Sequence, residues 1–227
     1  MMQPMTTEEV EAYYNQRWRD LQGLDSMVDH WYWRPGWRMG RSFYTWHITF
    51  ENAPEVQQLA TVYQRHISLP FLDPVPAEGL HLTMQGVGFT DEVSDADVAS
   101  IVAAAQERCK GLAPFSLRIG PADADPQGVP LAVRPWAPVV ELRRAVRAAI
   151  ADVWGEDGVP EPADGFHAHV TVFYSNAPAD PASLRALLSE LRQLPPAETV
   201  VERVSLIRLN RNSKVYRWTP AGQVVLA

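Results

Sequence analysis

Apolar and polar residues alternate in several short stretches of this chain, a pattern typical of β-strands with one buried and one exposed face. These stretches are FYTWHITF (43–50), LHLTMQGVGF (80–89), FSLRIG (115–120), VPLAVRPW (129–136) and FHAHVTVFY (166–174). Between them, apolar residues recur at helical spacing after start signals at Thr6, Pro54, Ser94, Pro138 and Asp180. The tail from 199 to 218 predicts a hairpin that turns near Asn210 to Ser213.

The order of these elements repeats once along the chain. Helices that begin at Pro54 and Pro138 lie 84 residues apart, and the histidines of the strands that follow them, His81 and His169, lie 88 residues apart. An internal repeat of this kind predicts a duplicated architecture. We therefore expect an α+β fold, a bilobed, pseudo-two-fold duplicated domain. Two mainly antiparallel sheets would form its central cleft, with the helices on the outside.

Residues 1–42 differ in composition from the rest. The segment TTEEVEAYY predicts a helix, and DHWYWRPGWRMGR (29–41) interleaves tryptophan with arginine. Such a segment can stack nucleobases, but it can equally pack its aromatic side chains on a neighbouring surface. We expect an N-terminal helical and aromatic arm, residues 1–42, that packs on a main domain of residues 43–227.

Composition limits the classes of function. The chain has 227 residues, 46% of them hydrophobic, which is enough for one sizeable core. Its net charge of −7 argues against a general nucleic-acid binder but is compatible with a small nucleotide in a local pocket. No apolar run reaches the roughly 18 residues of a membrane helix, and the acidic N-terminus lacks the apolar region of a signal peptide. With Cys109 as the single cysteine, we expect a buried thiol and a cytoplasmic protein. We also expect a monomer that does not bind a membrane, and the sequence indicates no specific protein partner.

The candidate chemistry lies in the two histidine strands. Side chains two residues apart on a strand share a face, so His81 lies beside Thr83 and His169 beside Thr171. If the lobes face each other, both pairs line one cleft. One neutral imidazole can then accept a proton while the other protonates the departing oxygen of a phosphoester. The threonine hydroxyls can donate to the phosphate oxygens, and this scheme needs no metal and no cofactor.

The paired motifs HLTM (81–84) and HVTV (169–172) resemble the two-histidine phosphoesterase superfamily, also called the 2′-5′ RNA ligase or LigT-like family. The resemblance covers about residues 43–226. It implies a bilobed α+β fold and metal-independent action on cyclic phosphodiesters or 2′-5′ linkages, with the roles given above for the two histidines and two threonines. The implied enzyme is a cyclic phosphodiesterase or 2′-5′ RNA ligase-like phosphoesterase, a hydrolase of RNA processing whose substrate is a nucleotide or an RNA end.

Many relatives carry a basic residue shortly after one or both motifs, but this chain has Gln85, Phe173 and Tyr174 there. Gln85 and Tyr174 are accessory candidates. Strict alternation places Tyr174 on the face opposite His169, so it reaches the cleft only if the strand bulges or ends early. Among the basic residues of the tail, Arg208 and Arg217 are the candidates for contact with a terminal phosphate or a nucleobase.

Further histidines leave alternatives open. His47 and Thr49 in WHITF are accessory candidates on a neighbouring strand, although His47 has no counterpart in the second repeat. His167 shares a face with His169 if the strand is regular, and a His-x-His pair can ligate zinc. The main alternative is therefore a metal-dependent hydrolase that uses His47, His167 and His169. A non-catalytic nucleotide- or RNA-binding module is the other. The remaining His30 and His66 are expected at the surface or in packing.

Overall fold

The computed structural model describes residues 5–227, so residues 1–4 of the predicted arm lie outside it. The helices are α1 (Thr7–Gln22), α2 (Pro54–His66), α3 (Asp95–Arg108), α4 (Ala137–Trp154) and α5 (Ala182–Leu191). The strands are β1 (Phe43–Thr49), β2 (Leu72–Pro74), β3 (His81–Phe89), β4 (Phe115–Ala122), β5 (Gly128–Arg134), β6 (His169–Ser175), β7 (Ala197–Val201), β8 (Arg203–Asn210) and β9 (Arg217–Val225).

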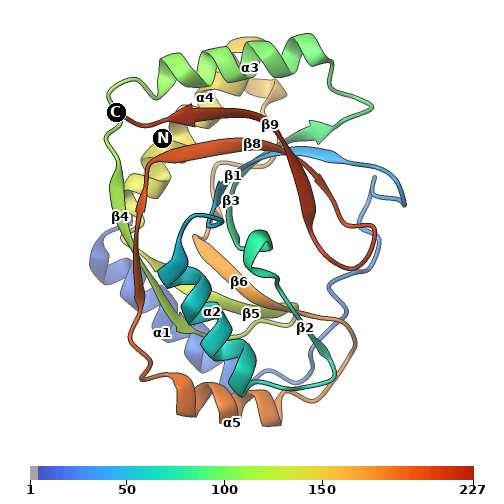
Figure 1. Cartoon of the computed structure of the whole chain (residues 1–227), viewed down its shortest axis with the longest axis vertical. Helices are drawn as coiled ribbons and strands as arrows, with labels where there is room; N and C mark the ends of the chain where they lie inside the picture. The colour runs from blue at the N-terminus through green and yellow to red at the C-terminus, as the bar shows by residue number, and fades with distance from the viewer. Residues whose placement is uncertain (1–4) are drawn as a thin grey trace.

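The strands form two antiparallel sheets, which occupy the upper and lower halves of the molecule in Figure 1. The first sheet has the order β3-β1-β8-β9 and the second the order β2-β6-β5-β4-β7. Each sheet contains one of the two motif strands, β3 in the first and β6 in the second. The predicted α+β architecture, with two lobes built on antiparallel sheets, is confirmed.

The helices cover the sheets in a crossed arrangement (Figure 1). Although α2 follows β1 of the first sheet, it packs on the second, where the Tyr63 hydroxyl accepts a hydrogen bond from the Ala122 N–H at 3.0 Å. Conversely, α4 follows β5 of the second sheet and packs on the first, where Arg143 Nε donates to the Met84 carbonyl at 2.8 Å. Each of these helices therefore ties one half of the repeat to the other.

The N-terminal helix lies against the second sheet. α1 begins with the predicted capping box, in which the Thr6 hydroxyl accepts from the Glu9 N–H and the Glu9 carboxylate accepts from the Thr6 N–H. Its buried Tyr14 hydroxyl accepts from the Val133 N–H at 2.8 Å and from Trp136 Nε1 at 2.9 Å. The helix that the local sequence predicts is thus held against the second sheet by hydrogen bonds with residues that are distant in the sequence.

The segment between α1 and β1 runs from one lobe to the other. Near its start, the Met27 N–H donates to the Ala179 carbonyl at 2.8 Å, on the side of the second sheet. Near its end, the Arg41 guanidinium lies 3.6 Å from the centre of the Phe89 ring on β3 of the first sheet. We call residues 23–42 the crossing segment.

Two predictions about the strands are wrong. The second motif strand begins at His169 rather than at Phe166. The tail is also more than one hairpin, because β7 pairs with β4 in the second sheet before the chain passes through Glu202 into β8 of the first. Cys109 is buried as predicted. Within residues 5–227 no helix combines the length and the apolar character that crossing a bilayer requires.

Candidate active site

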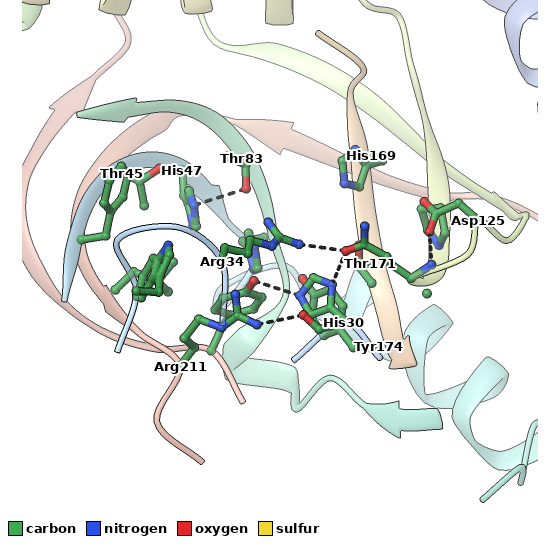
Figure 2. A pocket seen from close by; sticks show the side chains of 18 of the residues that line it. His30, Arg34, Thr45, His47, Thr83, Asp125, His169, Thr171, Tyr174 and Arg211 are labelled. Carbon is green, nitrogen blue, oxygen red and sulfur yellow. Dashed lines mark hydrogen bonds between the residues drawn. The ribbon is translucent and has the colours of Figure 1, made fainter. Parts of the chain in front are cut away.

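Both motif pairs line one cavity between the two sheets. The cavity has a volume of about 510 Å³, and its walls include His81 and Thr83 at the start of β3 and His169 and Thr171 at the start of β6. Figure 2 shows Thr83 on one side of it and His169 and Thr171 on the other. The structure therefore brings together the residues that the motifs single out.

The same backbone contact orients both motif histidines. Nδ1 of His81 lies 2.8 Å from the carbonyl oxygen of Gly79, and Nδ1 of His169 lies 2.8 Å from the carbonyl oxygen of His167. Because a carbonyl oxygen only accepts, Nδ1 carries the hydrogen in each ring. Nε2 is then the atom left for chemistry in the cavity.

Both motif strands bulge at the fourth position of the motif. In the first sheet the partners of Trp46 and His47 are Gln85 and Thr83, so Met84 has no partner on β1. In the second sheet the partners of Val129 and Pro130 are Phe173 and Thr171, which leaves Val172 unpaired in the same way. An extra residue in one strand reverses the alternation beyond it.

The bulges decide which residues after the motifs reach the cavity. Tyr174, five residues after His169, lines it, so the condition set by the sequence for this accessory candidate is met. The matching position on β3 is Gly86, whose N–H donates to the Glu161 carboxylate at 3.3 Å. A Cβ atom there would lie 2.7 Å from that carboxylate, so a side chain could enter only if the carboxylate moved.

A side chain from each crossed helix binds the carbonyl of a bulged residue. Arg143 on α4 donates to the Met84 carbonyl at 2.8 Å, and Gln64 on α2 donates to the Val172 carbonyl at 3.1 Å. Bulged residues leave the ladder with the neighbouring strand, so their buried carbonyls need other donors. The Val172 carbonyl has a second one, the Val75 N–H at 3.0 Å. In each case a helix of one half therefore donates a side-chain hydrogen bond to the bulged strand of the other half, from arginine in one case and from glutamine in the other.

His81 occupies a buried environment. It is 9% exposed and stacks on the His47 ring with centroids 4.4 Å apart and planes 3° apart. Trp218 meets it edge-on at 5.5 Å. Burial lowers the pKa of His81 to about 4, opposed by the bond to Gly79 and reinforced by the charge of His169. The ring is neutral at pH 7.

His47 also lines the cavity but is almost completely enclosed. Its Nε2 lies 3.3 Å from the Thr83 hydroxyl, whereas Nδ1 is buried without a hydrogen-bond partner. Burial lowers the pKa of His47 well below its usual value. A neutral imidazole packed between the motif histidine and the motif threonine suits a positioning role better than proton transfer.

Three accessory candidates do not line the cavity. Thr49 borders a separate small pocket at the end of β1. Gln85 is fully buried and faces α4, where its side-chain oxygen accepts from Arg147 at 2.7 Å, because the bulge at Met84 turns it away. His167 precedes β6 and stacks on Tyr13 of α1 with centroids 4.5 Å apart.

The zinc set considered from the sequence does not assemble. His47 stacks on His81, whereas the ring of His167 stacks on Tyr13. The expectation that His167 shares a strand face with His169 is wrong, because the strand begins only at His169. Across residues 5–227, no three His, Cys, Asp or Glu side chains gather in a group that could hold a metal ion.

Several cavity residues were missed or misplaced by the sequence reasoning. Arg208 and Arg217 do not line the cavity; the basic residues that do are Arg211, after β8, and Arg34 of the crossing segment. The signal for Arg34 was the interleaving of arginine with tryptophan around it. Nothing in that pattern indicated which arginine enters the cleft. Figure 2 shows Arg34 reaching into the space between the two motif strands.

His30 was expected at the surface or in packing, and it is a buried residue of the cavity wall. Its Nδ1 lies 3.1 Å from the Gln127 side-chain oxygen and its Nε2 lies 2.9 Å from the Tyr216 hydroxyl. The ring stacks on Tyr174 with centroids 4.1 Å apart. Burial, with the charges of nearby arginines, lowers the pKa of His30 to about 3, so this ring is a neutral support.

Comparisons with known proteins agree with this architecture. The model of the 2′-5′ RNA ligase superfamily matches residues 50–213. No match is found among curated protein sequences.

Solved structures show the same fold. The protein TT0787 from Thermus thermophilus is 21% identical, with a TM-score of 0.63 over 81% of this chain and 97% of that one. LigT from E. coli in complex with 3′-AMP is 20% identical, with a TM-score of 0.60 over 82% of this chain and 98% of that one. LigT has also been crystallised with ATP and with NADP+. At these identities the likeness establishes the fold.

Proposed function

Because the chain belongs to the 2′-5′ RNA ligase superfamily, we propose that it is a metal-independent phosphoesterase of nucleotides or RNA ends. Its substrates would be cyclic phosphodiesters of the 2′,3′-cyclic phosphate type or 2′-5′ linkages. Superfamily membership supports phosphoesterase activity, and the nucleotides bound by LigT favour a nucleotide ligand here. The observation that carries the proposal is the pair of imidazoles, His81 and His169, with Nδ1 fixed by backbone and Nε2 left for one cavity.

His81 is the proposed general base. Burial keeps its ring neutral at pH 7, and Nδ1 already carries a hydrogen bound to Gly79. Nε2 therefore has a free lone pair that takes a proton from water. The water oxygen forms the new bond to phosphorus, and the imidazolium that results loses its proton to solvent after the reaction.

His169 is the proposed general acid. Its side chain is exposed, so water solvates its charged form. As the bond between phosphorus and a ribose oxygen breaks, Nε2–H gives its proton to that oxygen. A 2′,3′-cyclic phosphate then becomes a phosphate monoester with one free hydroxyl, and His169 takes a new proton from solvent.

The motif threonines are the proposed donors to the non-bridging phosphate oxygens. Thr83 is exposed and Thr171 half-buried, so both hydroxyls are accessible to a ligand. If His47 Nε2–H donates to the Thr83 oxygen, the hydroxyl hydrogen is free for the phosphate. This tautomer leaves an unprotonated nitrogen at the partnerless Nδ1, where it costs less than a buried N–H.

The test of this function is a panel of substrates in the presence of EDTA. Purified protein is incubated with nucleoside 2′,3′-cyclic phosphates, 2′-5′ dinucleotides and 3′-5′ dinucleotides, and the products are resolved by chromatography and ³¹P NMR. We expect turnover of a cyclic phosphate or a 2′-5′ linkage that EDTA does not reduce.

Two other results would replace the proposal. Loss of turnover in EDTA, with recovery on adding zinc, would indicate a metal-dependent hydrolase. Binding of a nucleotide without any product would indicate a non-catalytic binding module.

A further inference from the structure

The motif strands bring little positive charge to a cleft that has to hold a phosphate. Neither position five residues after a motif histidine is basic, since these positions are Gly86 and Tyr174. Among the described residues that line the cavity, the lysine and arginine side chains are Arg34 and Arg211 alone. Both come from outside the motif strands, and Arg34 also precedes residues 50–213, which match the superfamily model.

Arg34 has hydrogen-bonding capacity that the protein does not use. Its Nη2 donates to the Gln127 side-chain oxygen at 2.8 Å. Its Nε is buried and has no hydrogen-bond partner. Within residues 5–227 no carboxylate forms an ion pair with it. A buried charged donor without a partner is unfavourable, and an anion that accepts from it relieves this.

Arg211 is a second guanidinium beside the first. It is buried, donates to the His30 carbonyl at 2.8 Å, and lies 5.5 Å from the Trp31 ring centre and 5.8 Å from that of Tyr216. Burial lowers its pKa, and the charge of Arg34 acts in the same direction. Two neighbouring cations without an ion-paired carboxylate, in a chain of net charge −7, form a site for an anion.

The site adjoins the second motif. Burial raises the pKa of Tyr174 far above its usual value, and the charge of Arg34 opposes this rise. The Gln127 oxygen that accepts from Arg34 also lies 3.1 Å from Nδ1 of His30, whose ring stacks on Tyr174. Tyr174 and Thr171 line the same cavity as Arg34. In Figure 2 the Arg34 side chain extends across the cleft to the side on which Thr171 lies, and the dashed line drawn from it is the hydrogen bond to Gln127.

We propose that Arg34, supported by the neighbouring charge of Arg211, binds the non-bridging oxygens of the phosphate on which the histidines act. The crossing segment would thereby complete the active site, supplying the positive charge that the motif strands lack. This inference rests on the proposed function for the identity of the phosphate. The presence of an anion site at Arg34 can be tested without turnover.

The first experiment measures binding of inorganic phosphate to the full chain by thermal shift and by isothermal titration. We expect Arg34→Gln to weaken phosphate binding at least tenfold and Arg34→Lys to restore part of it, because a charged hydrogen bond is lost and then partly replaced. The matched control is Arg38→Gln. Arg38 belongs to the same segment but is exposed and pairs with Asp91, so this variant should bind phosphate normally.

Phosphate-free melting separates binding from folding. Arg34→Gln should melt only slightly below the wild-type temperature without phosphate, since the fold loses the hydrogen bond from Nη2 to Gln127 but no contact of the unpartnered Nε. Phosphate binding that is unchanged in Arg34→Gln overturns the inference. So does an equal loss in Arg38→Gln, which would mean that the whole segment has shifted.

The second experiment identifies the phosphate. On a nucleoside 2′,3′-cyclic monophosphate, which has a single phosphate, Arg34→Gln should lower kcat/KM about ten- to a hundredfold. A loss confined to substrates with an additional 5′-phosphate would overturn the assignment to the reacting phosphate. If the wild-type protein turns over nothing in the panel, the proposed function fails, whereas the phosphate-binding result still decides whether the anion site exists.

Discussion

His81 and His169 occupy matching positions at the start of β3 and β6, but their surroundings differ. The ring of His81 is 9% exposed and stacked on His47, with Trp218 against its edge. His169 is exposed, and among the described residues no aromatic ring packs on it. The backbone contact that orients each ring is nevertheless the same.

This comparison shows how a duplicated motif can supply two opposite functions. The repeated part, a histidine bound to a carbonyl two residues earlier, sets the direction of the ring. The part that differs is burial, which keeps the His81 ring neutral. A buried imidazole is kept neutral and can accept a proton, while a solvated one can carry a proton to donate. The sequence motif is the same in both halves, so only the environment distinguishes the proposed base from the proposed acid.

The largest expected effect comes from replacing each histidine. His81→Asn and His169→Asn should each lower kcat on a nucleoside 2′,3′-cyclic phosphate about a hundredfold or more. The two variants should differ on a nucleotide p-nitrophenyl phosphodiester, because p-nitrophenolate leaves without needing a proton. We expect His169→Asn to recover most activity on this substrate and His81→Asn to recover little.

The control for these variants is His66→Asn, since His66 is exposed on α2 outside the cavity. Circular dichroism verifies that each variant is folded. Recovery of His81→Asn instead of His169→Asn would reverse the roles, and the difference in burial would then not determine them. Wild-type rates in both variants would remove both residues from the mechanism.

The next effect concerns pH. Since burial lowers the pKa of His81 to about 4, the proposed base stays neutral until the pH approaches that value. The rate kcat/KM should therefore persist through pH 5 and fall about tenfold per unit only below about pH 4. Two imidazoles with ordinary pKa values would instead place the acid limb of the profile near neutral pH. Short assays, with folding checked at each pH, measure it, and an acid limb centred near pH 6.5 would contradict it.

The sequence was sufficient for the parts of the site that depend on local alternation. A histidine and a threonine two residues apart share a strand face in any regular strand, so each motif pair could be placed from sequence. The repeat of the pattern predicted that both pairs meet in one cleft, which is how the two sheets place them. Burial of His81 could not be predicted, because it depends on His47 and Trp218 from other strands.

Residues after the motifs required information that is not local. The bulges at Met84 and Val172 turn Gln85 away from the cavity and bring Tyr174 into it. Nothing in the strand sequences marks these bulges, since the side-chain donors to their carbonyls come from helices of the opposite half. Arg34 likewise reaches the cavity only because of the path that the crossing segment takes between the lobes, which the local sequence does not determine.

Removing the side-chain donors to the bulged carbonyls should have the mildest consequences for activity. Gln64→Met keeps the length of the side chain but removes the side-chain donor to the Val172 carbonyl, on the strand of the proposed acid, which then retains the Val75 N–H. Arg143→Met removes the donor to the Met84 carbonyl beside the proposed base, and with it the donors to the carbonyls of Pro162 and Ala163. Each should lower kcat only a few-fold, because a small displacement of one motif pair is enough to weaken alignment. Stability should fall by about 1 kcal/mol in Gln64→Met, because the Val75 N–H still satisfies the Val172 carbonyl, and by more in Arg143→Met, because three carbonyls lose a donor.

The two substrates distinguish this positioning from a general loss of stability. If Gln64 acts through His169, the deficit of Gln64→Met should shrink on the p-nitrophenyl substrate, which needs no acid. The deficit of Arg143→Met should remain, because the base is still required. Gln57→Met is the matched control, since Gln57 lies on the same helix but donates to the Phe50 carbonyl before α2. Equal deficits in Gln64→Met and Gln57→Met, on both substrates, would show that the donors stabilise the fold without orienting the histidines.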